Sequence, residues 1–268
     1  MSGKINVPGP SYPVVEGSHF NSSEIFYWSE ISIGQHHEVF KIGTDAILLG
    51  AWVPKVIVKA NDILDAGTGT GILALMMAHA FPDAMITAID QEAAAISLAD
   101  YNFKNSLWPD RLFALHQSIL DPPTSDHKKF DLILSNPPFF YNQLSAKEGV
   151  KSTSKHAVAS TQVWMQSLSD KLNPSGHLCI VVPYVSAVDW ITAANGIGRY
   201  CHHRLNIFSY PDDPVAVRSL LHFHDKLVQP EMERLTIYEG ADQYSRSYLE
   251  FSKISQRGDR IKNQDQKQ

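Results

Sequence analysis

The sequence has little cysteine, no long apolar run and no excess of positive charge. Two cysteines among 268 residues are too few for a disulfide framework, and Cys179 lies in the apolar segment 178–182, which indicates core packing. No run of eighteen apolar residues is present, and residues 1–12 lack the apolar stretch of a secretory signal. A formal net charge of −5 argues against a uniformly basic surface that would hold nucleic acid. We therefore expect a cytoplasmic protein without a membrane span.

One main domain is expected from length and composition. A hydrophobic content of 44% is ordinary for a globular core, and 268 residues suffice for one large α/β domain. Residues 1–19 are rich in Gly, Pro and Ser and show no periodicity, which predicts a flexible leader. Residues 253–268 are polar, which predicts a frayed tail. The domain itself is expected at residues 20–252.

Strand-like and helix-like segments alternate along this domain. Apolar runs predict strands at 62–65, 85–90, 112–116, 130–135 and 177–182, and helical periodicity predicts helices at 71–80, 92–104, 160–172 and 185–197. Such alternation favours a parallel sheet with helices on both faces. Two further strands, 204–209 and 216–223, follow each other across a turn-rich segment, which indicates an antiparallel hairpin. The prediction is a seven-stranded, mostly parallel α/β sheet whose last strand is antiparallel.

A glycine-rich loop follows the first strand of this pattern. The segment Ile63-Leu64-Asp65-Ala66-Gly67-Thr68-Gly69-Thr70-Gly71 joins a strand to a helix, so its glycines let a ligand approach the backbone and the helix N-terminus. A dinucleotide fingerprint needs glycine at the sixth place, which is Ile72 here, and the lysine of a phosphate-binding P-loop is missing. Nothing in the loop fits a triphosphate, and a strand followed by such a glycine loop is suggestive of the kind that holds S-adenosylmethionine.

Asp90 ends the second strand nineteen residues after Gly71. A carboxylate there can accept hydrogen bonds from both ribose hydroxyls of a nucleoside cofactor. An ordinary structural role is the alternative, because Gln91-Glu92 opens a helix that Asp90 could cap. The residues after the third strand, Gln117-Ser118-Ile119, are expected to border the adenine ring by the same loop geometry.

The segment Asn136-Pro137-Pro138-Phe139 ends the fourth strand and is suited to a planar amino group. The Asn136 side-chain oxygen and the Pro137 carbonyl can accept the two hydrogens of a conjugated –NH2, while Pro138 keeps residue 137 extended. Phe139 offers a face for a stacked base. A turn that merely terminates a strand is the alternative. The motif predicts methyl transfer onto nitrogen, catalysed mainly by positioning.

Basic residues and histidines gather at a few places in the sequence. Lys147, Lys151, Lys155 and His156 form one group, and Arg199, His202, His203 and Arg204 form another; both are candidates for contacts with RNA phosphates, and solvated loops are the alternative. His222 and His224 share a strand face, whereas adjacent pairs such as His202-His203 are expected to point apart. No cysteine or carboxylate spacing completes a metal site, so we expect none.

The sequence resembles the bacterial family of tRNA1(Val) adenine-N6-methyltransferases over about residues 25 to 250. The resemblance is most specific in the segment 40–52, FKIGTDAILLGAW, and extends to the opening strands near Phe26-Tyr27-Trp28, the strand 218–223 and Tyr244-Ser245. It implies the class I methyltransferase fold, which is Rossmann-like. It also implies methylation, with S-adenosylmethionine, at N6 of adenosine 37 of a valine tRNA.

The resemblance also implies roles for individual residues. The catalytic turn would be Asn136, Pro137, Pro138 and Phe139, and the cofactor would be bound by Lys41, Thr44, Asp45, Asp65, Gly67, Thr68, Gly69, Gly71, Asp90, Gln91, Ser118 and Ile119. The segment from Lys41 to Asp45 would lie over the methionine end, although Thr44 or Asp45 could instead cap the helix that follows. The chain departs from the family pattern at Ser118-Ile119, where an acidic residue is usual and Asp121 comes two residues late.

Three alternative functions share parts of this pattern. A glutamine methyltransferase of a peptide release factor uses the same turn on an amide, but that family resembles the chain only from Asp65 to Phe139. A guanine-N2 methyltransferase of ribosomal RNA would usually follow the turn with histidine and glycine, where Phe140-Tyr141 stands here. A non-catalytic RNA-binding protein that keeps the fold is the third, and the intact Asn-Pro-Pro-Phe segment argues against it.

Overall fold

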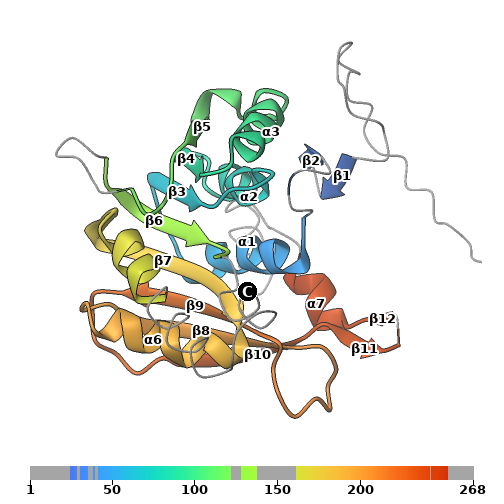
Figure 1. The fold of residues 1–268 in the computed structure, drawn as a ribbon. Coiled ribbons are helices and arrows are strands. Elements are labelled where there is room, and N and C mark those ends of the chain that lie inside the picture. Colours follow the sequence, from blue (N-terminus) through green and yellow to red (C-terminus); the bar gives the residue numbers. More distant parts are fainter. Residues whose placement is uncertain are drawn as a thin grey trace, which may run out of the picture.

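A central eight-stranded sheet organises the computed structural model, which describes residues 25–28, 31–35, 39, 42–121, 128–137, 161–241 and 243–252 (Figure 1). The order of its strands is β10-β8-β9-β7-β6-β3-β4-β5. In chain order they are β3 (Asp62–Ala66), β4 (Met85–Asp90), β5 (Leu112–His116), β6 (Phe130–Ser135), β7 (Leu172–Pro183), β8 (Tyr200–Phe208), β9 (Arg218–His224) and β10 (Glu231–Thr236).

The pairing confirms a mostly parallel sheet with an antiparallel strand near its end. Strand β9 runs antiparallel to both neighbours, β7 and β8, and every other pair is parallel. The expected number of seven strands omitted β10, which adds an eighth strand at the edge beside β8. Strand β10 is mostly exposed and carries charged residues where a half-buried strand would carry apolar ones. Its sequence therefore lacks the alternation of apolar and polar residues by which a strand is predicted.

Helices cover both faces of the sheet. On one face pack α1 (Thr44–Val56), α2 (Ile72–Ala80), α3 (Ala93–Lys104) and the short α7 (Arg246–Phe251). On the other face pack the helix at residues 161–169, the short helix η3 (Tyr184–Ser186) and α6 (Ala187–Asn195). A 3-10 turn, η2 (Pro109–Arg111), precedes β5. All nine residues of α2 are buried, because this helix lies between the sheet and α1.

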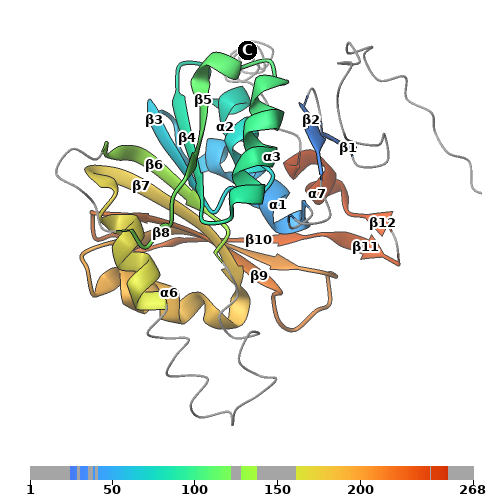
Figure 2. The same cartoon turned by 45° about the horizontal axis from the view of Figure 1, so that its top comes forward.

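Two small hairpins stand apart from the main sheet. The strands β1 (Ile25–Trp28) and β2 (Ile31–Gly34) pair antiparallel beside α3, as expected for the opening segment. The strands β11 (Tyr238–Gly240) and β12 (Gln243–Tyr244) pair next to α7. Figure 2 shows both hairpins at the same side of the molecule. None of the helices in the described ranges is long and apolar enough to cross a membrane.

Several predicted boundaries differ from the observed ones. The helix α1 begins at Thr44 with Gly43 as its N-cap, and no side chain forms a capping hydrogen bond, so the alternative in which Thr44 or Asp45 caps this helix is wrong. Strand β7 begins at Leu172, five residues earlier than expected, with a register irregularity opposite β6. The predicted leader at 1–19 and the tail at 253–268 lie outside the described residues.

Candidate functional site

The glycine loop and the Asn136 turn open at the same edge of the sheet. Strands β3 and β6 are parallel neighbours, and Ala66 at the end of one pairs with Ser135 at the end of the other. The Ser135 hydroxyl also donates a 2.8 Å hydrogen bond to the Ala66 carbonyl. The next residues along the two strands are Gly67 and Asn136, so the two segments emerge side by side at the carboxyl edge, where ligands of such sheets bind.

The described part of the Asn136 turn ends at Pro137. Asn136 is half-buried and Pro137 is buried, so the turn begins against the core and its amide side chain keeps partial access to solvent. Pro138 and Phe139 lie outside the described residues, as does Lys41 of the lead-in segment.

The backbone of the loop has the form that its glycines permit. The φ angles of Gly67, Gly69 and Gly71 are +81°, +55° and +86°, values that residues with a side chain rarely adopt. A Cβ added at Gly67 or Gly69 would meet no atom of the described residues within 4 Å, so this part of the structure leaves open space beside both. The N–H groups of Gly67 and Thr68 donate to the Ile89 carbonyl at 2.9 and 3.0 Å and fix the loop to strand β4.

Asp65 is a fully buried carboxylate at the base of the loop. Its Oδ2 accepts hydrogen bonds from the Thr68 hydroxyl at 2.6 Å and from the Ala74 N–H at 3.1 Å. Within the described ranges no donor reaches Oδ1. Burial raises the pKa of Asp65 to about 7, against the lowering effect of its two hydrogen bonds and with a small addition from the charge of Asp90. Oδ1 is closed off from solvent, so Asp65 acts on the loop from beneath it, through its bonds to Thr68 and Ala74.

Asp90 shapes the loop and the turn that follows β4. One carboxylate oxygen accepts from the Gly69 N–H at 3.0 Å, and the other accepts from the Glu92 N–H at 3.0 Å. The N-cap of α3 is Glu92 rather than Asp90. Each carboxylate oxygen can accept more than one hydrogen bond, so these contacts leave capacity for ribose hydroxyls. Gln91, next to it, is exposed and its carbonyl is 2.8 Å from His116 Nε2.

The turn after β5 is held by a lysine that the sequence pattern did not indicate. Lys171 is 5% exposed, and its Nζ donates to the carbonyls of Ile119 at 2.9 Å and Asp121 at 3.1 Å. Burial lowers the pKa of Lys171. Ser118 donates its N–H to the carboxylate of Asp121 at 3.0 Å, so the acidic residue that comes two positions late folds back to Ser118. The side chain of Ile119 is buried in the core.

The lead-in segment is tied to the late strands by an ion pair. Arg218 Nε lies 2.8 Å from Asp45 Oδ2, and both side chains are partly buried. Arg218 is opposite Pro183 at the carboxyl end of β7. This contact joins the start of α1 to the edge of the sheet that bears Asn136. Thr44, the first residue of α1, is exposed.

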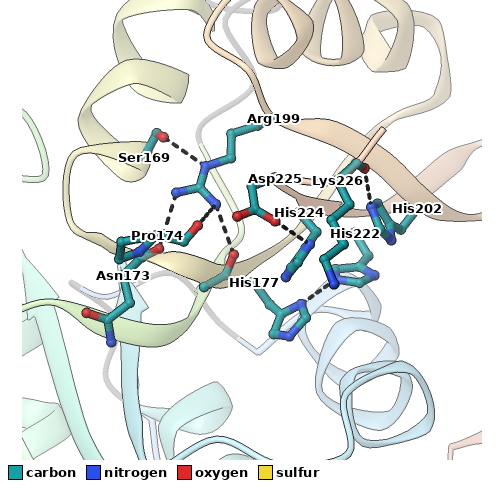
Figure 3. Close-up of polar contacts among 11 residues, drawn as sticks. Ser169, Asn173, Pro174, His177, Arg199, His202, His222, His224, Asp225 and Lys226 are labelled. Carbon is teal, nitrogen blue, oxygen red and sulfur yellow. Dashed lines mark hydrogen bonds and ion pairs between the residues drawn. The ribbon is translucent and has the colours of Figure 1, made fainter. Parts of the chain in front are cut away.

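Arg199, the first residue of the second basic group, is not available for the expected phosphate contacts. Arg199 is 8% exposed and donates to the carbonyls of Pro174 and Gly176, both at 3.1 Å, and of Asn173 at 3.3 Å (Figure 3). It precedes β8, whose amino end lies at the sheet edge opposite the loop. A guanidinium enclosed by carbonyls there supports the fold and cannot meet RNA phosphates at the site. The first group, 147–156, lies outside the described residues.

Five histidines gather at the same opposite edge, partly shown in Figure 3. His202 and His203 both contact His222, with ring centroids 5.6 and 5.4 Å apart, so the expectation that this pair points apart is wrong. A register irregularity at 201–203 is the reason, because a bulge turns both side chains to one face. His177 Nδ1 lies 2.9 Å from His222 Nε2, and His224 contacts the ring of His177. Across the described ranges no group of three or more ligating side chains is arranged to hold a metal ion.

Comparisons with known proteins agree with this geometry. A family model described as "Methyltransferase small domain" matches residues 36–186. A tRNA1(Val) (adenine(37)-N6)-methyltransferase of Bacteroides thetaiotaomicron is 33% identical over 87% of this chain and 97% of its own length. Proteins of the same name from Haemophilus influenzae and Vibrio cholerae are 29% and 33% identical over 85% of this chain, and 96% and 93% of their own lengths.

Solved structures show the same fold at low identity. A predicted O-methyltransferase from Agrobacterium tumefaciens superposes with a TM-score of 0.60 at 17% identity, covering 78% of this chain and 95% of its own. A methyltransferase from Pyrococcus furiosus gives a TM-score of 0.53 at 18% identity, covering 74% and 90%.

Proposed function

Because the chain belongs to the methyltransferase small domain family and to the family of tRNA1(Val) (adenine(37)-N6)-methyltransferases, we propose that it methylates N6 of adenosine 37 in a valine tRNA. The methyl donor would be S-adenosylmethionine, and the enzyme would act in the cytoplasm. The single observation that carries this proposal is the pairing of Ala66 with Ser135, which sets the glycine loop beside the Asn136 turn. A donor and an amino acceptor held by these two segments would share one edge.

The residues of the loop fit S-adenosylmethionine. Open space beside Gly67 and Gly69 lets a ligand lie against the backbone. Asp65 would hold the loop in its binding form from below, and Asp90 would offer an acceptor to the ribose. Ser118 and Ile119 would border the adenine, with Asp121 close by through its bond to Ser118. When bound, the cofactor supplies an electrophilic methyl group on a positive sulfonium.

The turn at Asn136 would prepare the amine for attack. An exocyclic amine of adenine is a weak nucleophile because its lone pair is delocalised into the ring. The Asn136 side-chain oxygen and the Pro137 carbonyl would accept its two hydrogens and favour the pyramidal form. The target base must leave its stack to reach this edge. N6 would bond to the methyl carbon as its bond to sulfur breaks and the sulfur becomes a neutral thioether, and the extra proton on N6 would leave to solvent afterwards. No strong base is needed in this step, so positioning by the turn would provide most of the rate enhancement.

The relatives favour tRNA over the alternative substrates. The family of the release-factor glutamine methyltransferases shares only the segment from the loop to the turn, whereas the curated tRNA methyltransferases match from the lead-in to the late strands, over 85% or more of the chain. The lysines at 147, 151 and 155 remain our candidates for phosphate contacts, because they follow the turn directly in sequence.

The test is single-turnover methylation of a valine tRNA transcript with labelled S-adenosylmethionine. The Asn136→Ala variant should lose about 100-fold or more in rate, since it removes an acceptor that the reacting amine needs. Its affinity for the cofactor should stay unchanged. Asn195→Ala, at the exposed end of α6, is the matched control and should behave as wild type. Full activity of Asn136→Ala would overturn the catalytic assignment.

A further inference from the structure

One buried amide connects the N-terminal hairpin to the glycine loop. Asn102, on the buried stripe of α3, is 2% exposed. Its side-chain oxygen accepts from the Gly34 N–H at 2.8 Å, and its Nδ2 donates to the Gly34 carbonyl at 3.1 Å and to the Thr70 carbonyl at 2.8 Å. A primary amide has two hydrogens to donate, and both are used here. Segments 68 and 32 residues away are therefore joined through one side chain.

The contact with Thr70 acts on the end of the glycine loop, where α2 begins. Thr70 is 3% exposed and immediately precedes Gly71, which is the N-cap of α2. The other loop peptides have partners of their own: Gly67 and Thr68 bond to Ile89, and Gly69 bonds to Asp90. The bond from Asn102 fixes the last peptide plane before α2. The orientation of that plane decides where the first N–H groups of the helix point, and these groups face the ligand position in such loops.

Gly34, the hairpin residue in this contact, lies close against Asn102. Strand β2 buries Ile31 and Ile33 in the main core and ends at Gly34. A Cβ added at Gly34 would lie 3.2 Å from Asn102 Oδ1, tighter than an ordinary van der Waals contact. The φ of Gly34 is not in the left-handed region, so the lack of a side chain here serves the approach of the amide. Figures 1 and 2 both show β2 beside α3.

We infer that Asn102 is a positioning residue for the proposed methyl transfer, which sets the cofactor loop through Thr70 and couples it to the β1–β2 hairpin. The inference rests on the proposed function for its cofactor. Loss of the amide leaves a buried N–H and two buried carbonyls without their partner, and the loop end then relaxes away from its binding form. Loss of the amide should lower the affinity for the cofactor, because Asn102 contacts the glycine loop at Thr70. It has no contact with the described part of the Asn136 turn.

Asn102→Asp tests this with almost no change of shape. The new carboxylate keeps an acceptor for the Gly34 N–H but places a second oxygen opposite two carbonyl oxygens. The Kd and KM for S-adenosylmethionine should rise about tenfold or more, with kcat at saturating cofactor changed less than about twofold. Protonation would restore one donor, so the ratio of the variant's Kd to that of wild type should shrink on acidification from pH 8 to pH 6. Asn105→Asp, at the exposed C-cap of the same helix, is the charge-matched control.

Gly34→Ala perturbs the same contact from the hairpin and is mild enough to fold. It should raise the Kd for S-adenosylmethionine about threefold or more. Gly240→Ala, whose added Cβ would meet no described residue within 4 Å, should leave the Kd unchanged. If Asn102→Asp unfolds, Gly34→Ala decides. Unchanged cofactor affinity in folded variants at both positions overturns the inference. A wild-type protein that binds the cofactor but leaves valine tRNA unmethylated would overturn the proposed function and leave the positioning role standing.

Discussion

The buried carboxylate of Asp65 should make the stability of the protein depend on pH in an unusual direction. Burial raises the pKa of Asp65 from 3.8 to about 7. In the unfolded chain the group loses its proton near 3.8, whereas in the folded protein it keeps the proton up to about 7. The folded state therefore binds more protons between these two values, and the free energy of unfolding falls as pH rises through that window. Above about pH 7 the carboxyl is ionised in both states, so its effect on the free energy of unfolding no longer changes with pH.

Asp65→Asn removes the titration and keeps a similar shape. One pKa unit corresponds to about 1.4 kcal/mol, so Asp65 should cost the wild type about 3 kcal/mol more at pH 8 than at pH 5. The Asn side chain can still accept from Thr68 and Ala74 with its oxygen. The difference in unfolding free energy, variant minus wild type, should accordingly grow by about 3 kcal/mol from pH 5 to pH 8.

Urea unfolding without cofactor, at four pH values in this range, measures that difference. Contributions from other groups, such as the histidine cluster, are common to both proteins and cancel. Asp100→Asn on the exposed side of α3 is the control, and its difference from wild type should stay flat. A difference for Asp65→Asn that is equally flat would refute the reasoning that the carboxylate is protonated in the folded protein.

Three further predictions concern contacts across the fold. Lys171→Met should lower the free energy of unfolding by about 1 to 3 kcal/mol and weaken cofactor binding, because the carbonyls of Ile119 and Asp121 lose their donor; unchanged values in urea unfolding and cofactor titration would contradict this. A double-mutant cycle with Asp45→Asn and Arg218→Gln should give a coupling of about 1 kcal/mol, reduced by 0.5 M salt, and strictly additive effects would show that the ion pair contributes nothing. Burial lowers the pKa of His222 to about 2, so stability that is complete above pH 6.5 should be lost as pH falls below it. His222→Gln should reduce the loss between pH 7 and pH 5 by about 2 kcal/mol, and an equal loss in both proteins would count against this origin.

The form of the glycine loop after β3 could be predicted from the sequence because its signals are local. Gly67, Gly69 and Gly71 stand where the backbone takes positive φ, and Asp90 follows at the end of the next strand. The antiparallel β8–β9 pair was also predictable, because a turn-rich segment without a helix separates two apolar runs. In both cases the information lies within a few residues of the feature.

The contacts that hold the site together carry no such signal. Lys171 reaches a turn 50 residues earlier, and Asn102 joins segments on either side of the first helix. A lysine at a helix end or an asparagine in an alanine-rich helix is ordinary in sequence, and only the packing reveals its partners. Arg199 is a case in which the sequence misleads. It stands in a basic group in the sequence, but the structure encloses its guanidinium with backbone carbonyls. The bulge at 201–203 has no visible sequence mark either, so the gathering of the histidines could not be foreseen.

The central claim is that the loop after β3 and the turn after β6 act together on the amino group of one adenosine. The most direct measurement is nucleoside analysis of tRNA from a strain lacking this protein, before and after incubation with the purified protein and labelled S-adenosylmethionine. We predict label in N6-methyladenosine alone, in valine tRNA, at position 37, and none with Asn136→Ala. Label in another nucleoside, or in N6-methyladenosine formed equally well by Asn136→Ala, would contradict the account.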